Sequence, residues 1–345
     1  MQLHIPQHFS RTLFKIMSNA KAIEARIQEA FHILSREAKE LYLQSEVAEI
    51  KHIITPLIFY REYVSKNIPL IIRGAVNHWP AVNKWSIPYF YKILGDEKVS
   101  VAVTPNGYAD AIAKDEETKK EFFVMPEERL LMMSEFLNML ENTKENSVYY
   151  IQKQNSNFIL TSFRKLWSDA EIEIPWASEA FGKNPDAVNF WMGDKRAITS
   201  MHKDPYENIY CVVSGEKNFI LHPPTDLPWI PYQNYPSAIY KECKPEKWII
   251  EPIVNKTSDS EEIADSTSLP WICVDPLNPD YEKYPKYRNV HSMKVTLRAG
   301  DILYLPSLWY HHVTQSHACI SINYWYDMEF DIKYAYFKTL ETLCK

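Results

Sequence analysis

The feature that most limits the possible folds of this chain is a series of short β-strand patterns in its second half. Each pattern is rich in apolar and aromatic residues and ends at a turn signal, such as Gly193-Asp194 or Pro223-Pro224. Many short strands separated by turns are typical of a sandwich or a barrel, and they argue against a parallel sheet. The patterns cover residues 148–152, 187–191, 209–213, 217–222, 294–297, 301–305 and 320–325.

Helical patterns flank this β-rich half. Apolar residues recur at spacings of three and four over residues 20–43, and similar patterns cover 57–64, 130–140 and 331–343. Such spacing predicts amphipathic helices. We therefore expect an α+β, mainly β fold with four parts. These are a flexible tail over 1–19, a helical and strand region over 20–145 that packs on the core, a β domain over 146–330 and a C-terminal helix over 331–345.

Two segments stand apart from these patterns. Residues 255–268 are acidic and rich in Ser and Thr, so we expect a mobile surface insert in the β domain. Residues 1–19 contain Arg11 and Lys15 but no acidic residue. That composition also fits a mitochondrial presequence, although a tail is the interpretation that we favour.

Composition excludes several classes of function. The chain has only 7 Gly and no GxGxxG or GxxxxGK[ST] motif, which argues against a dinucleotide or phosphate-loop protein. Its net charge is −6 without a basic run, so we expect no nucleic-acid partner. We find no apolar run of membrane-spanning length. Five dispersed cysteines predict reduced thiols in an intracellular protein.

The first candidate for chemistry is His202-Lys203-Asp204. Residues two apart on a strand point to the same face, so the imidazole and the carboxylate could bind one metal ion. With 11 His and 44 acidic residues, however, about one His-x-Asp/Glu match arises by chance. Taken alone, His202 is better explained as an ordinary packed or surface histidine.

Lys217 strengthens the case for a site. If a two-residue turn at Ser214-Gly215 or Gly215-Glu216 forms a hairpin, Lys217 pairs with Val212 or Ser214. That pairing puts Lys217 on the face predicted for His202, Asp204 and Asn208. A lysine buried beside Phe219 needs an anion, and a metal-chelated dicarboxylic keto acid would supply one. A solvated lysine at the hairpin remains the alternative.

A third ligand is needed, because two residues hold iron poorly. His311 and His312 follow an apolar strand pattern, and adjacent strand residues face opposite ways, so at most one of them joins the site. Cys319 and His222 compete with this pair on chemical grounds. Two His and one carboxylate are the ligand set of non-haem Fe(II) oxygenases.

Together these residues carry a specific resemblance. His202-x-Asp204, Lys217, the run Gly300-Asp301-x-Leu303-Tyr304-Leu305-Pro306-x-x-Trp309 and then His311 resemble the Jumonji C family of Fe(II) and 2-oxoglutarate oxygenases. The likeness extends from about residue 50 to the end and is strongest to the lysyl hydroxylases of that family. It implies a double-stranded β-helix, which is a cupin-like jelly roll with flanking helices.

The resemblance also implies roles for residues. His202, Asp204 and His311 would bind Fe(II), with His311 chosen because the ligand of the family is followed by one residue and a β-branched one, here Val313. Lys217 would pair with the C5 carboxylate of 2-oxoglutarate, which reacts with O2. Further contacts to the cosubstrate or the pocket would come from Thr199, Tyr150, Asn208, Asn323 and Trp325.

The expected activity is hydroxylation of a lysine side chain, at C3, in a GTP-binding protein. The alternatives are a metal-dependent endo- or aminopeptidase acting on histone tails, a lysine demethylase and an inactive binding module. We expect a cytoplasmic protein that is also nuclear. The amphipathic terminal helices make a homodimer plausible.

Overall fold

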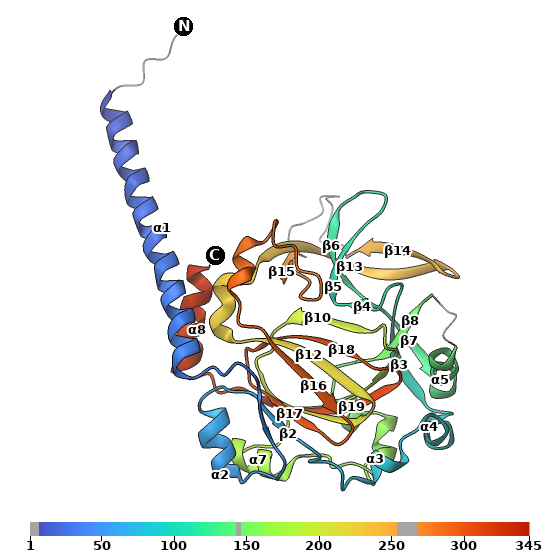
Figure 1. Ribbon diagram of the computed structural model, residues 1–345. Coiled ribbons are helices and arrows are strands. Elements are labelled where there is room, and N and C mark those ends of the chain that lie inside the picture. The colour runs from blue at the N-terminus through green and yellow to red at the C-terminus, as the bar shows by residue number, and fades with distance from the viewer. Residues whose placement is uncertain (1–6, 143–145, 254–267, 345) are drawn as a thin grey trace.

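The computed structural model describes residues 7–142, 146–253 and 268–344 (Figure 1). Its centre is a pair of sheets that face each other. The larger sheet has nine strands in the order β1-β2-β17-β11-β19-β9-β8-β3-β7. These strands are β1 (Ala48–Ile50), β2 (Leu70–Ile72), β17 (Ile302–Leu305), β11 (Tyr206–Ser214), β19 (Cys319–Asp327), β9 (Ala187–Gly193), β8 (Val148–Ile151), β3 (Lys98–Thr104) and β7 (Glu127–Met132).

The sheet opposite has five strands in the order β16-β12-β18-β10-β4. They are β16 (Met293–Arg298), β12 (Glu216–His222), β18 (Tyr310–Gln315), β10 (Ile198–His202) and β4 (Tyr108–Ala109). Side chains such as Val212, Phe219 and Leu303 fill the space between the two sheets. The predicted mainly β fold is therefore confirmed, and its two facing sheets form the cupin-like jelly roll that was expected.

A third sheet extends from one end of this sandwich. It contains β14 (Lys247–Pro252), β13 (Tyr232–Lys244), β6 (Glu121–Met125) and β5 (Ala111–Lys114), and β15 (Ser268–Ile272) also pairs with β13. The insert predicted over 255–268 lies outside the described residues, except for Ser268 at the start of β15.

Helices cover the outer face of the nine-stranded sheet, where Phe90, Phe136 and Phe190 belong to the largest apolar cluster. Most of them are short. They are α2 (Pro56–Phe59), the π-helical η1 (Tyr60–Val64), α3 (Pro80–Lys84), α4 (Ile87–Leu94), α5 (Met133–Glu141), α6 (Asn157–Leu160), the 3₁₀ turn η2 (Ser162–Leu166) and α7 (Pro175–Phe181).

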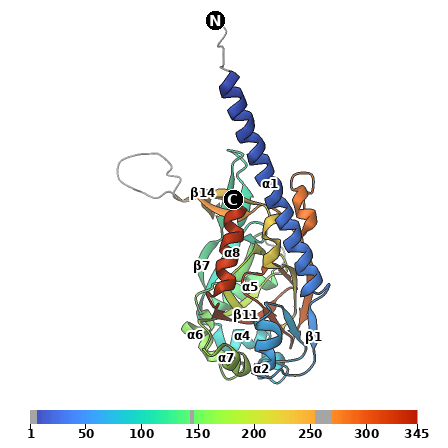
Figure 2. The same cartoon turned by 90° about the vertical axis from the view of Figure 1, so that its left-hand side faces the viewer.

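The long terminal helices lie on another side. They are α1 (Gln7–Leu41) and α8 (Ile332–Leu343), and the 3₁₀ turn η3 (Pro224–Trp229) contacts both, while a further turn, η5 (Pro285–Asn289), lies nearby. Trp229 Nε1 donates a hydrogen bond to Ser35 Oγ at 2.6 Å and its ring packs edge-on against Phe31. The first turns of α1 extend beyond the body of the molecule (Figure 2).

The helix α1 corrects one expectation. A tail was predicted over 1–19, yet the helix begins at Gln7 rather than at residue 20, and residues 1–6 lie outside the described part. No Gly or Pro interrupts the chain between Gln7 and Leu41, so nothing in the backbone stops the helix at residue 20.

The strands β11 and β12 correct a second expectation, the hairpin between them. The sequence predicts a hairpin, but β11 pairs with β17 and β19, whereas β12 pairs with β16 and β18 in the facing sheet. Gly215, with φ +80°, carries the chain across from one sheet to the other. Lys217 is therefore opposite Leu297 and Gln315, and not Val212 or Ser214.

Candidate active site

Two histidines and one carboxylate converge between the two facing sheets. His202 ends β10 and is the cross-strand partner of His311 on β18, with ring centroids 4.2 Å apart. Asp204 Oδ2 lies 3.5 Å from Nε2 of His202 and 3.6 Å from Nε2 of His311. One ligand atom from each residue falls within 4.8 Å of the others.

The route by which Asp204 reaches this point differs from the expectation. It does not share a strand with His202, because β10 ends at His202 and Asp204 lies in the connection to β11. Leu308 fixes that connection by donating its backbone N–H to the Asp204 carbonyl at 2.9 Å. Leu308 has φ +66°, a conformation that costs a residue other than Gly about 1–2 kcal/mol. The surrounding packing therefore holds this turn in place.

Hydrogen bonds set the tautomer of both histidines. Nδ1 of His202 lies 2.8 Å from the Ser200 carbonyl, and Nδ1 of His311 lies 3.1 Å from the Trp309 carbonyl. A carbonyl can only accept, so each Nδ1 carries a proton and each Nε2 is left as the atom that could bind a metal ion. This is the arrangement by which proteins orient metal-binding imidazoles.

Electrostatics keep the carboxylate ionised. Burial would raise the pKa of Asp204, but the adjacent His202 and His311 lower it to about 2. Burial and the nearby His202 lower the pKa of His311 to about 4, which favours its neutral form. Burial would lower the pKa of His202, but the adjacent Asp204 raises it, so a metal ion that binds here would displace a proton from this imidazole. Two imidazoles and one carboxylate are a donor set that Fe(II) accepts, with coordination positions left open. The three residues therefore fit a catalytic iron.

Lys217 is the buried cation of the same cavity. Its side chain is 1% exposed and its Nζ donates a hydrogen bond to the Tyr150 hydroxyl at 2.7 Å. The ammonium also lies over the rings of Trp191 and Tyr210, at 5.9 and 5.5 Å from their centroids. No carboxylate in the described part of the chain pairs with it. Burial lowers the pKa of Lys217 to about 8.

All nine residues predicted from the sequence line one cavity. His202, Asp204 and His311 lie in it with Lys217. Side chains of the remaining five complete the predicted set: Tyr150, Thr199, Asn208, Asn323 and Trp325. The Asn323 side chain on β19 connects the two neighbouring strands, β11 and β9. Its Nδ2 donates to Asn208 Oδ1 at 3.1 Å, and its Oδ1 accepts from Trp191 Nε1 at 2.8 Å.

Residues that had no assigned role also line this cavity. They are Gln154, Trp191, Tyr210, Phe219 and Val313. Strand alternation could have predicted two of these residues, because residues two apart on a strand face the same way. Tyr210 lies two positions after Asn208, and Phe219 lies two positions after Lys217. Trp325, stacked on Tyr206 with an interplanar angle of 7°, has a buried Nε1 without a partner among the described residues.

The competing ligands lie elsewhere. His312 faces away from the cavity, and its buried Nε2 has no partner in the described ranges. Nε2 of His222 lies 2.8 Å from the Tyr287 hydroxyl, and Cys319 packs in the apolar core between the sheets. Neither belongs to the group that could hold a metal ion.

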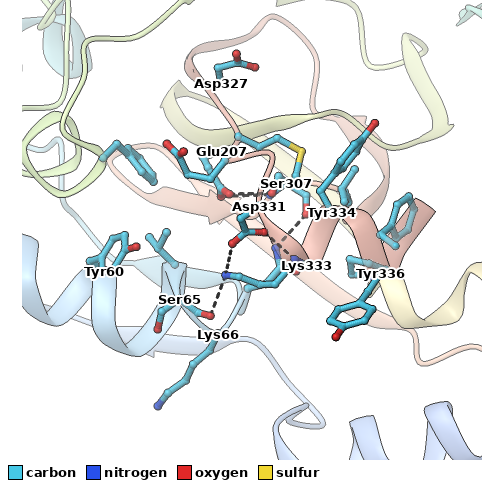
Figure 3. A pocket seen from close by; sticks show the side chains of 18 of the residues that line it. Tyr60, Ser65, Lys66, Glu207, Ser307, Asp327, Asp331, Lys333, Tyr334 and Tyr336 are labelled. Carbon is cyan, nitrogen blue, oxygen red and sulfur yellow. Dashed lines mark hydrogen bonds and ion pairs between the residues drawn. The ribbon is translucent and has the colours of Figure 1, made fainter. Parts of the chain in front are cut away.

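A larger pocket of ≈ 860 Å³ opens among α1, η1, α7 and α8. It shares no lining residue with the cavity of the metal triad, which is His202, Asp204 and His311. Figure 3 shows Lys333 at its centre, where Nζ donates to the Ser65 carbonyl at 3.3 Å and lies 3.9 Å from Asp331. At its floor Glu207 accepts a hydrogen bond from Ser307 Oγ at 2.8 Å. Lys333 and Glu207 are thus paired within the fold, and the pocket holds no cluster of metal ligands among the described residues.

Known proteins resemble this chain along most of its length. Residues 56–332 match the family described as the cupin-like domain. The chain is 49% identical to a bifunctional peptidase and (3S)-lysyl hydroxylase of Homo sapiens, over 89% of this chain and 92% of that protein. It is 39% identical to a lysine-specific demethylase of Arabidopsis thaliana, over 90% of each chain.

A JmjC domain-containing protein of Dictyostelium discoideum is 37% identical over 90% of this chain and 92% of its own length. Within the described ranges, no helix is both long and apolar enough to cross a membrane. The matched residues include every member of the triad and Lys217. The chain therefore belongs to the cupin-like Jumonji C family and is a 2-oxoglutarate-dependent dioxygenase.

Proposed function

We propose that this enzyme hydroxylates a lysine side chain, at C3, in a GTP-binding protein, using Fe(II), 2-oxoglutarate and O2. The observation that supports 2-oxoglutarate as the cosubstrate is Lys217. Its ammonium is buried beside the metal triad without a carboxylate partner in the described residues. A buried charge is costly unless an opposite charge meets it. The distal carboxylate of 2-oxoglutarate is an anion of the required kind.

Different residues of the cavity would bind the iron and the cosubstrate. His202, Asp204 and His311 would hold the iron, and Lys217 with the Tyr150 hydroxyl would bind the distal carboxylate. Thr199 and Asn208 line the space between these two groups and offer hydrogen bonds to the cosubstrate. The iron, once bound, supplies oxidation of a C–H bond to an alcohol while 2-oxoglutarate is oxidised to succinate and CO2. Aromatic walls such as Trp191 and Tyr210 exclude water.

The choice of lysine as the target is supported by the relative from Homo sapiens, whose name includes (3S)-lysyl hydroxylase. The same name includes a peptidase, and the relative from Arabidopsis thaliana is named a demethylase. Because these activities leave different products, one experiment separates them. Protein loaded with Fe(II) is incubated with 2-oxoglutarate, O2 and a GTP-binding protein, and the products are read by mass spectrometry.

The expected product is an intact substrate whose lysine has gained the mass of one oxygen atom, with one succinate per turnover. Loss of methyl groups from a methylated lysine would favour demethylation instead. Peptide cleavage that persists in the His202→Ala and Asp204→Ala proteins would exclude a metal-based peptidase. If 2-oxoglutarate binds equally well to the Lys217→Ala protein, the assignment of the cosubstrate is wrong.

We also propose a homodimer that acts in the cytoplasm and the nucleus. Exposed apolar side chains on the terminal helices support the dimer: Leu41 is 77% exposed, Ile332 64% and Tyr336 69%. The five unpaired cysteines support a reducing compartment. Light scattering of the Ile332→Glu protein tests the dimer, because a charge there should shift the mass to that of a monomer. Fractionation of cells tests the compartment.

A further inference from the structure

A carboxylate next to the metal site has no role in the account above. Asp110 follows β4, which runs parallel to β10 with Ala109 opposite Thr199. Ser200 Oγ donates a hydrogen bond to the Asp110 carbonyl at 2.6 Å. The backbone of Asp110 is thus attached to the strand that carries the ligand His202.

The conformation of Asp110 is unusual. Its φ is +52°, which only a few per cent of residues other than Gly adopt and which ends the strand alternation at this point. Asp tolerates this region better than most residues, yet the strain still costs about 1 kcal/mol. Such strained residues cluster at functional sites. The turn at Asp110 separates β4 from β5, which pairs with β6 in the third sheet.

The carboxylate itself is half-buried and has no hydrogen bond or ion pair within the described ranges. Two buried carboxylates, Asp169 and Asp194, have a cation partner, and two others, Glu207 and Asp226, accept hydrogen bonds. Asp110 interacts electrostatically with His202, and that interaction acts on both residues. Burial raises the pKa of Asp110 to about 6. The carboxylate of Asp110 thus lies near the metal-binding residues and has no cation partner among the described residues.

We propose that Asp110 binds the ammonium of the substrate lysine, an inference that rests on the proposed lysyl hydroxylation. Four bonds separate C3 of lysine from its nitrogen, a span of about 5 Å when extended. When C3 lies at the metal, the ammonium must therefore reach past it to a separate anionic group. Asp110 is such a group, because it does not belong to the metal-binding set and yet lies close enough to His202 to interact with it electrostatically.

The same geometry separates hydroxylation from demethylation. A demethylase oxidises the N-methyl carbon, so the substrate nitrogen itself lies at the metal. An anion about 5 Å farther along the side chain would then have no ammonium to bind. Asp110 is thus a specificity-determining residue for a lysine that enters side chain first and is oxidised near its backbone.

Binding measurements test this without the need to know the natural substrate. Protein loaded with Fe(II) and 2-oxoglutarate under anaerobic conditions is immobilised. It is then offered two peptide libraries, one with a fixed central lysine and one with norleucine, which has the same chain length but no ammonium. One charge-assisted hydrogen bond predicts that the wild-type protein retains the lysine library about tenfold better.

The Asp110→Asn protein should retain both libraries equally. The Asp275→Asn protein is the matched control, because Asp275 accepts a hydrogen bond from the Tyr108 hydroxyl at 3.3 Å and should keep the preference for lysine. The visible charge-transfer band of the iron and 2-oxoglutarate complex should be unchanged in both variants. That band shows that the metal site is intact.

The proposal is overturned if Asp110→Asn keeps the preference for lysine, or if the wild-type protein has none. The proposed function is tested separately, by adding O2 to the bound lysine library and measuring the gain of oxygen. A wild-type protein that prefers lysine through Asp110 but adds no oxygen would support the binding role and contradict lysyl hydroxylation.

Discussion

Replacement of Lys217 by Met should have opposite effects on the free protein and on the protein with 2-oxoglutarate. The Lys217 side chain is buried, and burial lowers its pKa from 10.5 to about 8. Met has a similar length and no charge. The substitution therefore removes a buried charge while it leaves most of the packing in place.

The magnitude follows from the difference in pKa between the unfolded and folded states. A lysine whose pKa falls on folding opposes folding below the folded pKa, and stability rises as the pH increases from about 8 toward 10.5. At neutral pH that shift corresponds to about 3 kcal/mol against the folded state. The lost hydrogen bond to the Tyr150 hydroxyl offsets about 1 kcal/mol. We expect the free Lys217→Met protein to gain about 2 kcal/mol in its free energy of unfolding.

With 2-oxoglutarate present the order should reverse. Removal of one partner of a buried ion pair costs about 3–5 kcal/mol, so 2-oxoglutarate should bind more than about a hundredfold more weakly to Lys217→Met. Denaturant titrations of both proteins, with Fe(II) and with or without 2-oxoglutarate, measure both effects. If the free variant is less stable than the wild type, the account of the buried charge is wrong. If 2-oxoglutarate stabilises both proteins equally, Lys217 does not bind it.

Further predictions concern the same cavity. The affinity for 2-oxoglutarate should fall about tenfold per pH unit above pH 8, because deprotonated Lys217 carries no charge; a flat titration would contradict this. His311→Ala should abolish binding of Fe(II) while His312→Ala retains it, as measured by metal analysis after gel filtration, and equal loss would contradict the assignment. Gly193→Ala should weaken 2-oxoglutarate binding about tenfold, because the new Cβ would lie 2.3 Å from Cδ2 of Tyr150; calorimetric titration tests this, and unchanged affinity would show that Tyr150 can move.

The strands were predictable because period-two patterns depend on local sequence. β11 alternates between Ile209 and Cys211, which face the helices, and Tyr210 and Val212, which face the opposite sheet. The pairing of strands was not predictable in this way. A turn at Gly215 is compatible both with a hairpin and with a crossing between sheets, and only the packing of β16, β17 and β18 selects the crossing.

Lys217 shows how a correct site can follow from an incorrect register. The expectation of a shared face came from pairing with Val212 or Ser214, which does not occur. Lys217 nevertheless lies in the cavity of the triad. The reason is that β11 and β12 belong to opposite sheets, and their inward side chains pack against each other in the core. The chemical argument, that a lysine in an apolar strand needs an anion, did not depend on the register.

The sequence alone determined the residue types of the metal and cosubstrate site, because each motif is a short run of residues and together these runs resemble a known family. It also determined the mainly β composition, through local alternation. The tertiary structure decided which strands are partners, how Asp204 reaches His202 from a turn, and which of His311 and His312 faces inward. It also placed the unpaired Asp110 beside His202, a proximity that no local pattern contains, since it arises from contacts between segments far apart in the chain.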